Sequence, residues 1–199
     1  NGTSGYEEAA GQGIIAGANA ALKILDREQF IMGRGAGYIG VMIDDLITNG
    51  VDEPYRMFTS RAEYRLVLRE DNAAERLCAA GRALGLVADE QWSRFERRQE
   101  QVVALRAWAG ESRFKPTVEN NQWLLSVQSS ELKDSVPVGS LVRRPELCLQ
   151  GLMNQLGYAE LVNADVVAGV ETDLKFQGYL QRQDEEVRKL QRMDEETIP

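Results

Sequence analysis

The stretch DEQWSRFERRQEQVVALRAW, residues 89–108, decides the fold class of this 199-residue chain. Its large apolar side chains recur at helical spacing, and we expect them in the core: Trp92, Phe95, Val102, Leu105 and Trp108. The arginines between them are expected to face water: Arg94, Arg97 and Arg98. The stretch therefore predicts a long helix that begins at Asp89.

Helical patterns continue on both sides of this stretch. Residues 163–192 carry one apolar stripe and predict a second long helix. Shorter helices are predicted over residues 5–22 and 38–48, from a cap at Asn72 to a stop at Gly85, through Trp123 and Leu124, and after Pro145. Residues 61–69 alternate apolar and charged side chains, which favours a half-buried strand. A helix would also place Arg61, Arg65 and Arg69 on one face, so a basic stripe is expected in either case. The predicted fold class is mainly α with a small β component.

Composition excludes several classes of function. With 43% hydrophobic residues the chain can build a core, and it contains no apolar run of about 18 residues, so no membrane helix is expected. Histidine is absent, and Cys78 and Cys148 lie far apart, which argues against a zinc site and against Ser-His or Cys-His catalysis. Both cysteines are expected to be small apolar residues buried in helices. The net charge of −8 argues against general nucleic-acid binding unless basic residues gather locally.

The N-terminal residues predict a capped helix with one narrow face. Ser4 followed three residues later by Glu7 is the pattern of a capping box. Small residues then recur every four positions along one face, at Ala9, Gly13, Gly17 and Ala21, so we expect this face to press against a sheet or a cofactor. The opening residues also read as a turn cut from something longer, and a fragment is expected.

Residues 35–40, GAGYIG, match the GxGxxG pattern of dinucleotide-binding folds. That interpretation requires a strand immediately before the glycines and an acidic residue about 20 positions later. The preceding residues are few and polar, and position 60 is Ser. A loop that leads into a short helix, Tyr38 to Thr48, is the favoured interpretation.

Basic residues concentrate in PYRMFTSRAEYRLVLR, residues 54–69. Arginine forks suit phosphate, and the interleaved Tyr55, Phe58 and Tyr64 could stack on bases. The alternative is a solvated face whose arginines pair with Glu63 or Asp44 and hold the fold. A second basic and aromatic strip lies in the last helix beside Gly178: Lys175, Tyr179 and Arg182.

Four motifs together resemble the MnmG family, also called GidA. They are NGTSGYEEAAGQG (1–13), GVMIDDLITNGVDEPYRMFTSRAEYRLVLREDNAAERL (40–77), RRPEL (143–147) and KFQGYLQRQDEE (175–186). The resemblance implies the FAD-dependent subunit of a cytoplasmic enzyme that adds an aminomethyl or carboxymethylaminomethyl group to carbon 5 of the tRNA wobble uridine. It further implies a GTPase partner, MnmE, a flavin reduced by NADH, a one-carbon unit from methylene-folate, and a homodimer.

The resemblance also assigns regions and residues. Residues 1–70 would be the C-terminal end of a Rossmann-like FAD domain with a tRNA-facing basic segment, and residues 71–199 a truncated helical C-terminal domain. Implied FAD contacts are Asn1, Gly2, Thr3, Ser4, Gly5 and Tyr6. Implied tRNA contacts are Arg56, Arg61, Arg65, Lys175, Tyr179 and Arg182. No catalytic or metal-binding residue is assigned, because Cys78 and Cys148 do not match the family's catalytic cysteines; the chain alone is expected to be inactive.

Two alternatives stay open. One is the folate-dependent tRNA methyltransferase relative, which shares the flavin-domain helix; the EPYRMFTSRAEYRL block and the long helical tail argue against it. The other is a non-catalytic helical module that binds tRNA or a protein.

Overall fold

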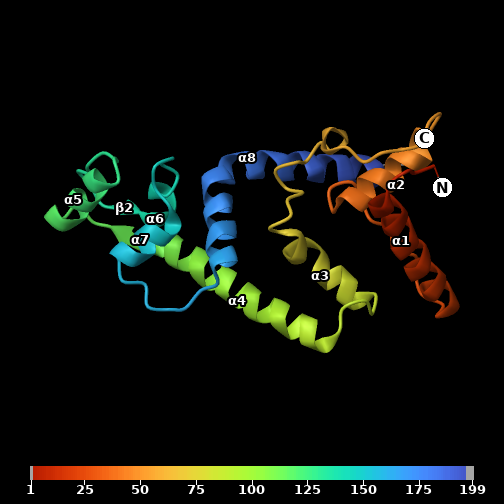
Figure 1. The fold of residues 1–199 in the computed structure, drawn as a ribbon, viewed down its shortest axis with the longest axis horizontal. Helices are drawn as coiled ribbons and strands as arrows, with labels where there is room; N and C mark the ends of the chain where they lie inside the picture. The colour runs from red at the N-terminus through yellow and green to blue at the C-terminus, as the bar shows by residue number, and fades with distance from the viewer. Residues whose placement is uncertain (1, 196–199) are drawn as a thin grey trace. The chain divides into compact units, whose positions relative to one another are not determined.

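The computed structural model describes the backbone of residues 2–195 and the side chains of residues 2–183 and 185. Its elements in chain order are α1 (Tyr6–Ile24), α2 (Tyr38–Thr48), the 3-10 helix η1 (Thr59–Arg61), α3 (Ala73–Ala83), α4 (Asp89–Glu111), β1 (Arg113–Phe114), α5 (Val118–Ser126), β2 (Val136–Pro137), α6 (Val138–Leu141), α7 (Leu149–Gln155) and α8 (Ala164–Glu195) (Figure 1). The prediction of a mainly α fold with a small β component is confirmed.

The chain forms two compact units. The first contains residues 1–88 and the chain from 182 onward, and the second contains residues 89–181. The domain boundary expected after residue 70 falls inside the first unit, because α3 belongs to that unit. None of the described helices combines the length and the apolar content that crossing a bilayer requires.

In the first unit, α1 and α2 pack side by side, as Figure 1 shows. Gly11 permits this approach, since a Cβ there would lie 3.2 Å from Met42 Cε and 3.3 Å from Ile39 Cγ1. A small core cluster, Val41, Ala62, Tyr64 and Leu68, joins α2 to the segment that follows η1. On α1 the small-residue face is exposed, and at Gly13 and Gly17 a Cβ would meet no described atom within 4 Å.

The strand predicted over residues 61–69 is wrong. The segment forms η1 and then turns, with the Val67 and Leu68 N–H groups donating to the Tyr64 carbonyl. The alternation nonetheless predicted burial, because Ala62 and Tyr64 are buried while the charged residues between and beside them are exposed. Period-two burial needs an extended chain against a core, whereas a strand also needs a hydrogen-bonded neighbour.

The predicted side-chain caps of the first unit are also wrong. Helix α1 begins at Tyr6 with Gly5 as its N-cap, and no side chain caps it. Ser4 is therefore one residue too early for the capping box. Asn72 is the N-cap of α3 as predicted, but its side chain donates to the Val67 carbonyl and accepts from Arg76 Nε instead of capping the helix.

The loop interpretation of GAGYIG is confirmed. A turn precedes α2, and α2 covers the predicted residues. Gly40 lies where the Gly33 peptide crosses the helix, since a Cβ would be 2.2 Å from the Gly33 carbonyl oxygen. Close packing of a loop on a helix explains this glycine without a bound nucleotide.

The second unit is built around one apolar core on α4, α6, α7 and α8. Residues in the pair β1–β2 lie antiparallel, with Phe114 opposite Val136. Val102 and Leu105 are buried as predicted. Trp92 and Phe95 are half-exposed and pack on each other with ring centroids 5.2 Å apart, so their predicted place in the core is wrong.

Two further side chains, Arg98 and Cys148, differ from expectation. Arg98 pairs with Asp165 and is not free in water. Cys78 is half-buried in α3, whereas Cys148 is exposed at the N-cap of α7, so the expected burial is wrong for Cys148. Neither cysteine forms a disulfide.

Candidate functional site

The first unit brings together two segments that the sequence analysis assigned to different ligands. We call residues 2–6 the N-terminal segment and residues 54–65 the arginine segment. Thr3 and Tyr55 form a parallel bridge, in which the Tyr55 N–H donates to the Gly2 carbonyl at 2.5 Å and the Ser4 N–H donates to the Tyr55 carbonyl at 3.2 Å. The predicted cofactor contacts and the predicted tRNA contacts are therefore adjacent.

Glu8, on the first turn of α1, ties the two segments together a second time. Its buried carboxylate accepts the Met57 N–H at 2.9 Å, and Arg56 Nε lies 3.7 Å from Oε1. The hydrogen bond from Met57, with one from its own N–H, holds the pKa of Glu8 below its usual value. The carboxylate is therefore ionised at neutral pH.

The N-terminal segment does not favour an added negative charge. Glu8 already lies against the N-terminus of α1, because a Cβ on Gly5 would be 1.7 Å from Glu8 Oε2. This carboxylate offsets the positive end of the helix dipole, so the N-terminus of α1 offers little attraction to a further negative charge. Glu8 Oε2 is buried and has no hydrogen-bond partner among the described residues.

The predicted cofactor residues differ in exposure. Ser4 is exposed, Tyr6 is 94% exposed, and Gly2 is exposed with a φ of 70°, a conformation that favours glycine. Thr3 is half-buried, Gly5 is buried, and Asn1 lies outside the described residues. Only Gly2, Ser4 and Tyr6 are therefore open to the edge of a planar cofactor.

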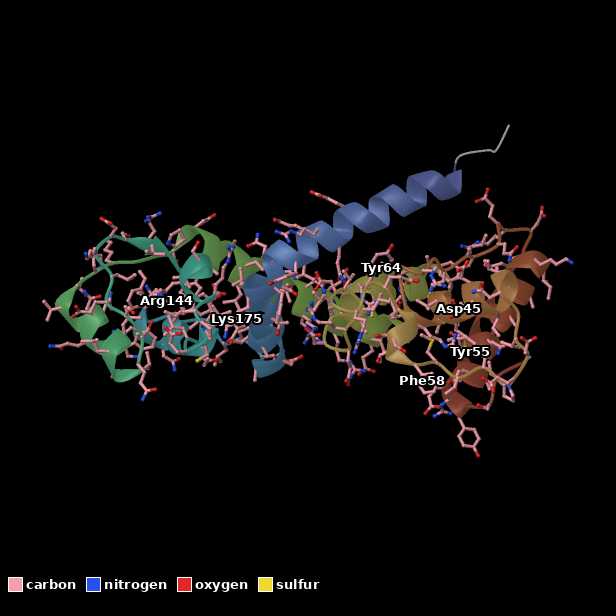
Figure 2. The ribbon with its side chains drawn as sticks, turned by 90° about the horizontal axis from the view of Figure 1, so that it is seen from above. Asp45, Tyr55, Phe58, Tyr64, Arg144 and Lys175 are labelled. Carbon is pink, nitrogen blue, oxygen red and sulfur yellow. The ribbon has the colours of Figure 1, made fainter. Side chains whose placement is uncertain are left out.

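Asp45 is the centre of the polar network beside the arginine segment (Figure 2). Its carboxylate, 8% exposed, accepts from the Tyr55 hydroxyl at 2.8 Å and from Arg34 Nη1 at 2.6 Å. Burial alone would raise the pKa of Asp45, but these hydrogen bonds outweigh it and lower the pKa. Burial and the bond to Asp45 raise the pKa of Tyr55, so Tyr55 remains a donor at neutral pH.

Arg34 also belongs to this network, although no sequence pattern predicted a role for it. Its guanidinium contacts three carboxylates and two backbone carbonyls: Asp44 at 2.8 Å, Asp45 at 2.6 Å, Glu63 at 2.6 Å, and the carbonyls of Val41 and Arg61. Glu63 and Asp44 were the acids expected to pair with the arginines of residues 54–69 if those arginines held the fold. Because Arg34 pairs with both acids, fewer acidic partners remain for the arginine segment.

The exposed part of the arginine segment surrounds a surface cavity of about 400 Å³, whose lining includes Asp52, Glu53, Arg56, Phe58 and Arg61. Phe58 is 57% exposed and the Arg56 and Arg61 side chains are 51% and 43% exposed. The cavity thus joins an exposed aromatic ring and two half-exposed guanidiniums, which suit a base and its phosphates, with two carboxylates, Asp52 and Glu53.

The other predicted RNA contacts of this segment are partly buried and partly exposed. Tyr55 and Tyr64 are 3% and 4% exposed, so neither can stack on a base, and that part of the prediction is wrong. Arg65 is exposed and has no ion-pair or hydrogen-bond partner in the described chain. It remains a candidate contact.

The strip on α8 is less uniform than its spacing suggested. Lys175, labelled in Figure 2, pairs with Glu171 at 2.8 Å and is three-quarters buried, while Tyr179 is 60% exposed. Lys175 and Tyr179 belong to the second unit and Arg182 to the first. Nowhere in the described residues do three Cys, Asp or Glu side chains lie close enough together to hold a metal ion.

Comparison with known proteins identifies the family of the chain. Residues 89–184 match the family model described as the tRNA modifying enzyme MnmG/GidA C-terminal helical domain, and residues 1–28 match the model described as glucose inhibited division protein A. The chain belongs to the MnmG/GidA family. The second structural unit coincides closely with the helical-domain match.

Individual relatives agree with this assignment. The chain is 45% identical over 199 residues to a tRNA uridine 5-carboxymethylaminomethyl modification enzyme MnmG of Listeria welshimeri, and 48% identical over 200 residues to the protein of that name from Streptococcus sanguinis. In both cases all of this chain is covered and 32% of the relative. A crystal structure of Aquifex aeolicus GidA is 38% identical, with a TM-score of 0.82, over all of this chain and 30% of that one. The chain thus spans about a third of the length of its relatives.

Proposed function

We propose that this chain is part of a flavin-dependent enzyme that modifies carbon 5 of the tRNA wobble uridine. The carrying observation is the direct backbone pairing of the N-terminal segment with the arginine segment at Thr3 and Tyr55. A surface suited to RNA phosphates and bases then lies beside a segment suited to a cofactor. The names of the relatives support the choice of substrate.

In this proposal each segment has a distinct task. Arg56, Arg61 and Arg65 contact the tRNA backbone, and Phe58 stacks on a base; Lys175, Tyr179 and Arg182 contribute further contacts. The exposed residues of the N-terminal segment, Gly2, Ser4 and Tyr6, contact FAD. The flavin, when bound, supplies redox chemistry to the enzyme.

The remaining components are proposed from the family resemblance. NADH would reduce the flavin, methylene-folate would supply the one-carbon unit, and the GTPase MnmE would act with the enzyme. The protein would work as a cytoplasmic homodimer, and the residues of this chain by themselves would not be sufficient for activity.

The test uses the full-length protein and two readouts. We expect Arg56→Ala combined with Arg61→Ala to lower tRNA affinity and to reduce the slope of log affinity against log salt by about 0.7–0.9 per lost phosphate contact. The matched control is Arg94→Ala, which removes an exposed arginine of α4 that pairs with Glu90. Unchanged affinity and slope in the double variant would move the RNA surface elsewhere.

The second readout is the visible absorbance of flavin in the same preparations. We expect flavin absorbance in the wild type and in both variants, because the substituted arginines are not proposed to touch the cofactor. Protein that binds tRNA but shows no flavin absorbance, even after incubation with FAD, would favour the non-catalytic binding module.

A further inference from the structure

Arg61 is held from one side and open on the other. Its Nε donates to the Arg56 carbonyl at 3.2 Å, its guanidinium carbon lies 4.6 Å from the centroid of the Tyr55 ring, and Nη1 is 3.8 Å from Asp45 Oδ2. Its side chain is nevertheless 43% exposed and lines the surface cavity. A long arginine side chain is therefore restricted before any ligand arrives.

The ring under Arg61 is itself fixed more firmly than Arg61. Tyr55 is 3% exposed, both its backbone groups are bonded to the N-terminal segment, and its hydroxyl donates to Asp45. Asp45 is fixed in turn by Arg34 at 2.6 Å. A chain of contacts thus runs from Arg34 through Asp45 and Tyr55 to Arg61.

Arg65 provides the contrast. It is exposed, and within the described residues it has neither an aromatic ring beneath it nor a carboxylate beside it. Both arginines carry the same charge, but only Arg61 is held by a buried ring. A restrained guanidinium loses less freedom when it binds and presents its N–H groups in one orientation.

We propose that Tyr55 is a positioning residue, which holds Arg61 through a cation–π contact in the orientation that meets an RNA phosphate. The proposal rests on the RNA contact assigned to Arg61 under the proposed function. Tyr55 is buried and cannot touch the RNA itself. Its hydroxyl bond to Asp45 fixes the ring, and the ring fixes Arg61.

The experiment is a double-mutant cycle in the full-length protein, with tRNA affinity measured over a range of salt concentrations. Tyr55→Met fills the site with a flexible apolar side chain that has no ring, and Tyr55→Phe is the matched control that retains the ring. We expect Tyr55→Met to lower tRNA affinity about two- to fivefold, the size of a cation–π contact at an exposed site. Tyr55→Phe should have a smaller effect and should retain the wild-type salt slope.

The decisive comparison is in the Arg61→Ala background. There Tyr55→Met should cause no further loss of affinity, because the arginine that it positions is absent. An equal loss in both backgrounds, or no loss in either, overturns the proposal, since the ring would then act only through stability or not at all. Melting temperatures measured alongside report the structural cost of Tyr55→Met, which should be smaller in the Arg61→Ala background because the cation–π contact is already absent there.

Two further outcomes are separable. If Arg61→Ala alone changes neither affinity nor salt slope, the RNA contact of the proposed function fails, and the positioning role fails with it. If Tyr55→Met does not fold, Tyr55→Leu takes its place in the same cycle as a second variant without a ring, with the same expected and overturning results.

Discussion

The two units of the chain are held together by different physical interactions. Among the described residues the second unit has sixteen buried apolar side chains in one continuous core, whereas the core cluster of the first has four. The first unit instead buries two carboxylates, Glu8 and Asp45, that accept hydrogen bonds from other segments. Apolar burial does not change with the protonation of side chains, whereas a carboxylate network does. The unit that holds the proposed cofactor contacts and the arginine segment is therefore the one whose stability depends more on pH.

The largest expected change in unfolding free energy comes from a substitution that creates a cavity in the core of the second unit. Phe114 is fully buried and packs against Trp123, so Phe114→Ala should cost about 3–5 kcal/mol of unfolding free energy. Trp92, Trp108 and Trp123 are the three tryptophans of the chain and all lie in the second unit, so tryptophan fluorescence in denaturant reports that unit. Phe58→Ala, which removes a mostly exposed ring of the first unit, should cost that unit less than about 0.5 kcal/mol. Hydrogen exchange at the amides of Val41 and Leu68, in the core cluster of the first unit, measures this cost. A similar cost for both would mean that the core is less dominant than its burial indicates.

The next test addresses the carboxylate network of the first unit. Asp45→Asn should cost about 2 kcal/mol at neutral pH, because it removes charge from hydrogen bonds with Arg34 and Tyr55. The pKa of Asp45 is lowered in the folded chain. The charged carboxylate therefore contributes its full stabilisation above the unfolded pKa of about 4, and this stabilisation is lost as the pH falls through the folded pKa. The difference in unfolding free energy between the wild type and Asp45→Asn should therefore shrink as the pH is lowered.

Hydrogen exchange at the amides of Val41 and Leu68, measured at neutral and acidic pH, follows this unit. Both residues belong to its core cluster. A stability gap that stays constant down to acidic pH would show that the charge of Asp45 does not hold the unit together.

The smallest expected change in stability comes from N-terminal capping, which differs between a helix of the second unit and one of the first. Thr117 caps α5 by accepting the Asn120 N–H at 3.2 Å, so Thr117→Ala should cost about 1 kcal/mol. Ser4 makes no cap to α1, and Ser4→Ala should change stability by less than about 0.5 kcal/mol. Thermal melting of both variants checks the pair. A larger loss for Ser4→Ala would indicate a capping contact at α1 after all.

Local signals explain the helices that were predicted correctly. The stop at Gly85 is an example: its φ is 77°, and the Leu86 N–H returns to the Gly81 carbonyl, which is a helix-terminating arrangement that favours glycine. The start of α4 at Asp89 and both ends of α2 follow from neighbouring residues in the same way. Helix formation depends on bonds and side-chain spacing within a few residues, so the sequence records it directly.

The errors share the opposite property. Arg34 binds carboxylates 10, 11 and 29 residues away, and nothing in its own neighbourhood indicates that it would pair with them. The alternation of residues 61–69 predicted burial but could not show that no strand lies alongside. Trp92 and Phe95 have the spacing of core residues, yet their end of α4 is not covered by the apolar core of the second unit.

The sequence by itself determined the helical class, the loop at GAGYIG and membership of the MnmG/GidA family, because each is carried by residues close together in the chain. The tertiary structure alone decided which arginines of residues 54–69 are restrained, which tyrosines are buried, and that Thr3 lies against Tyr55. These properties depend on distances between side chains and segments in the folded chain, which for Thr3 and Tyr55 are some fifty residues apart in sequence. Such distances exist only after the chain has folded, since burial and ion pairing are set by what surrounds a side chain in space and not by its neighbours in sequence.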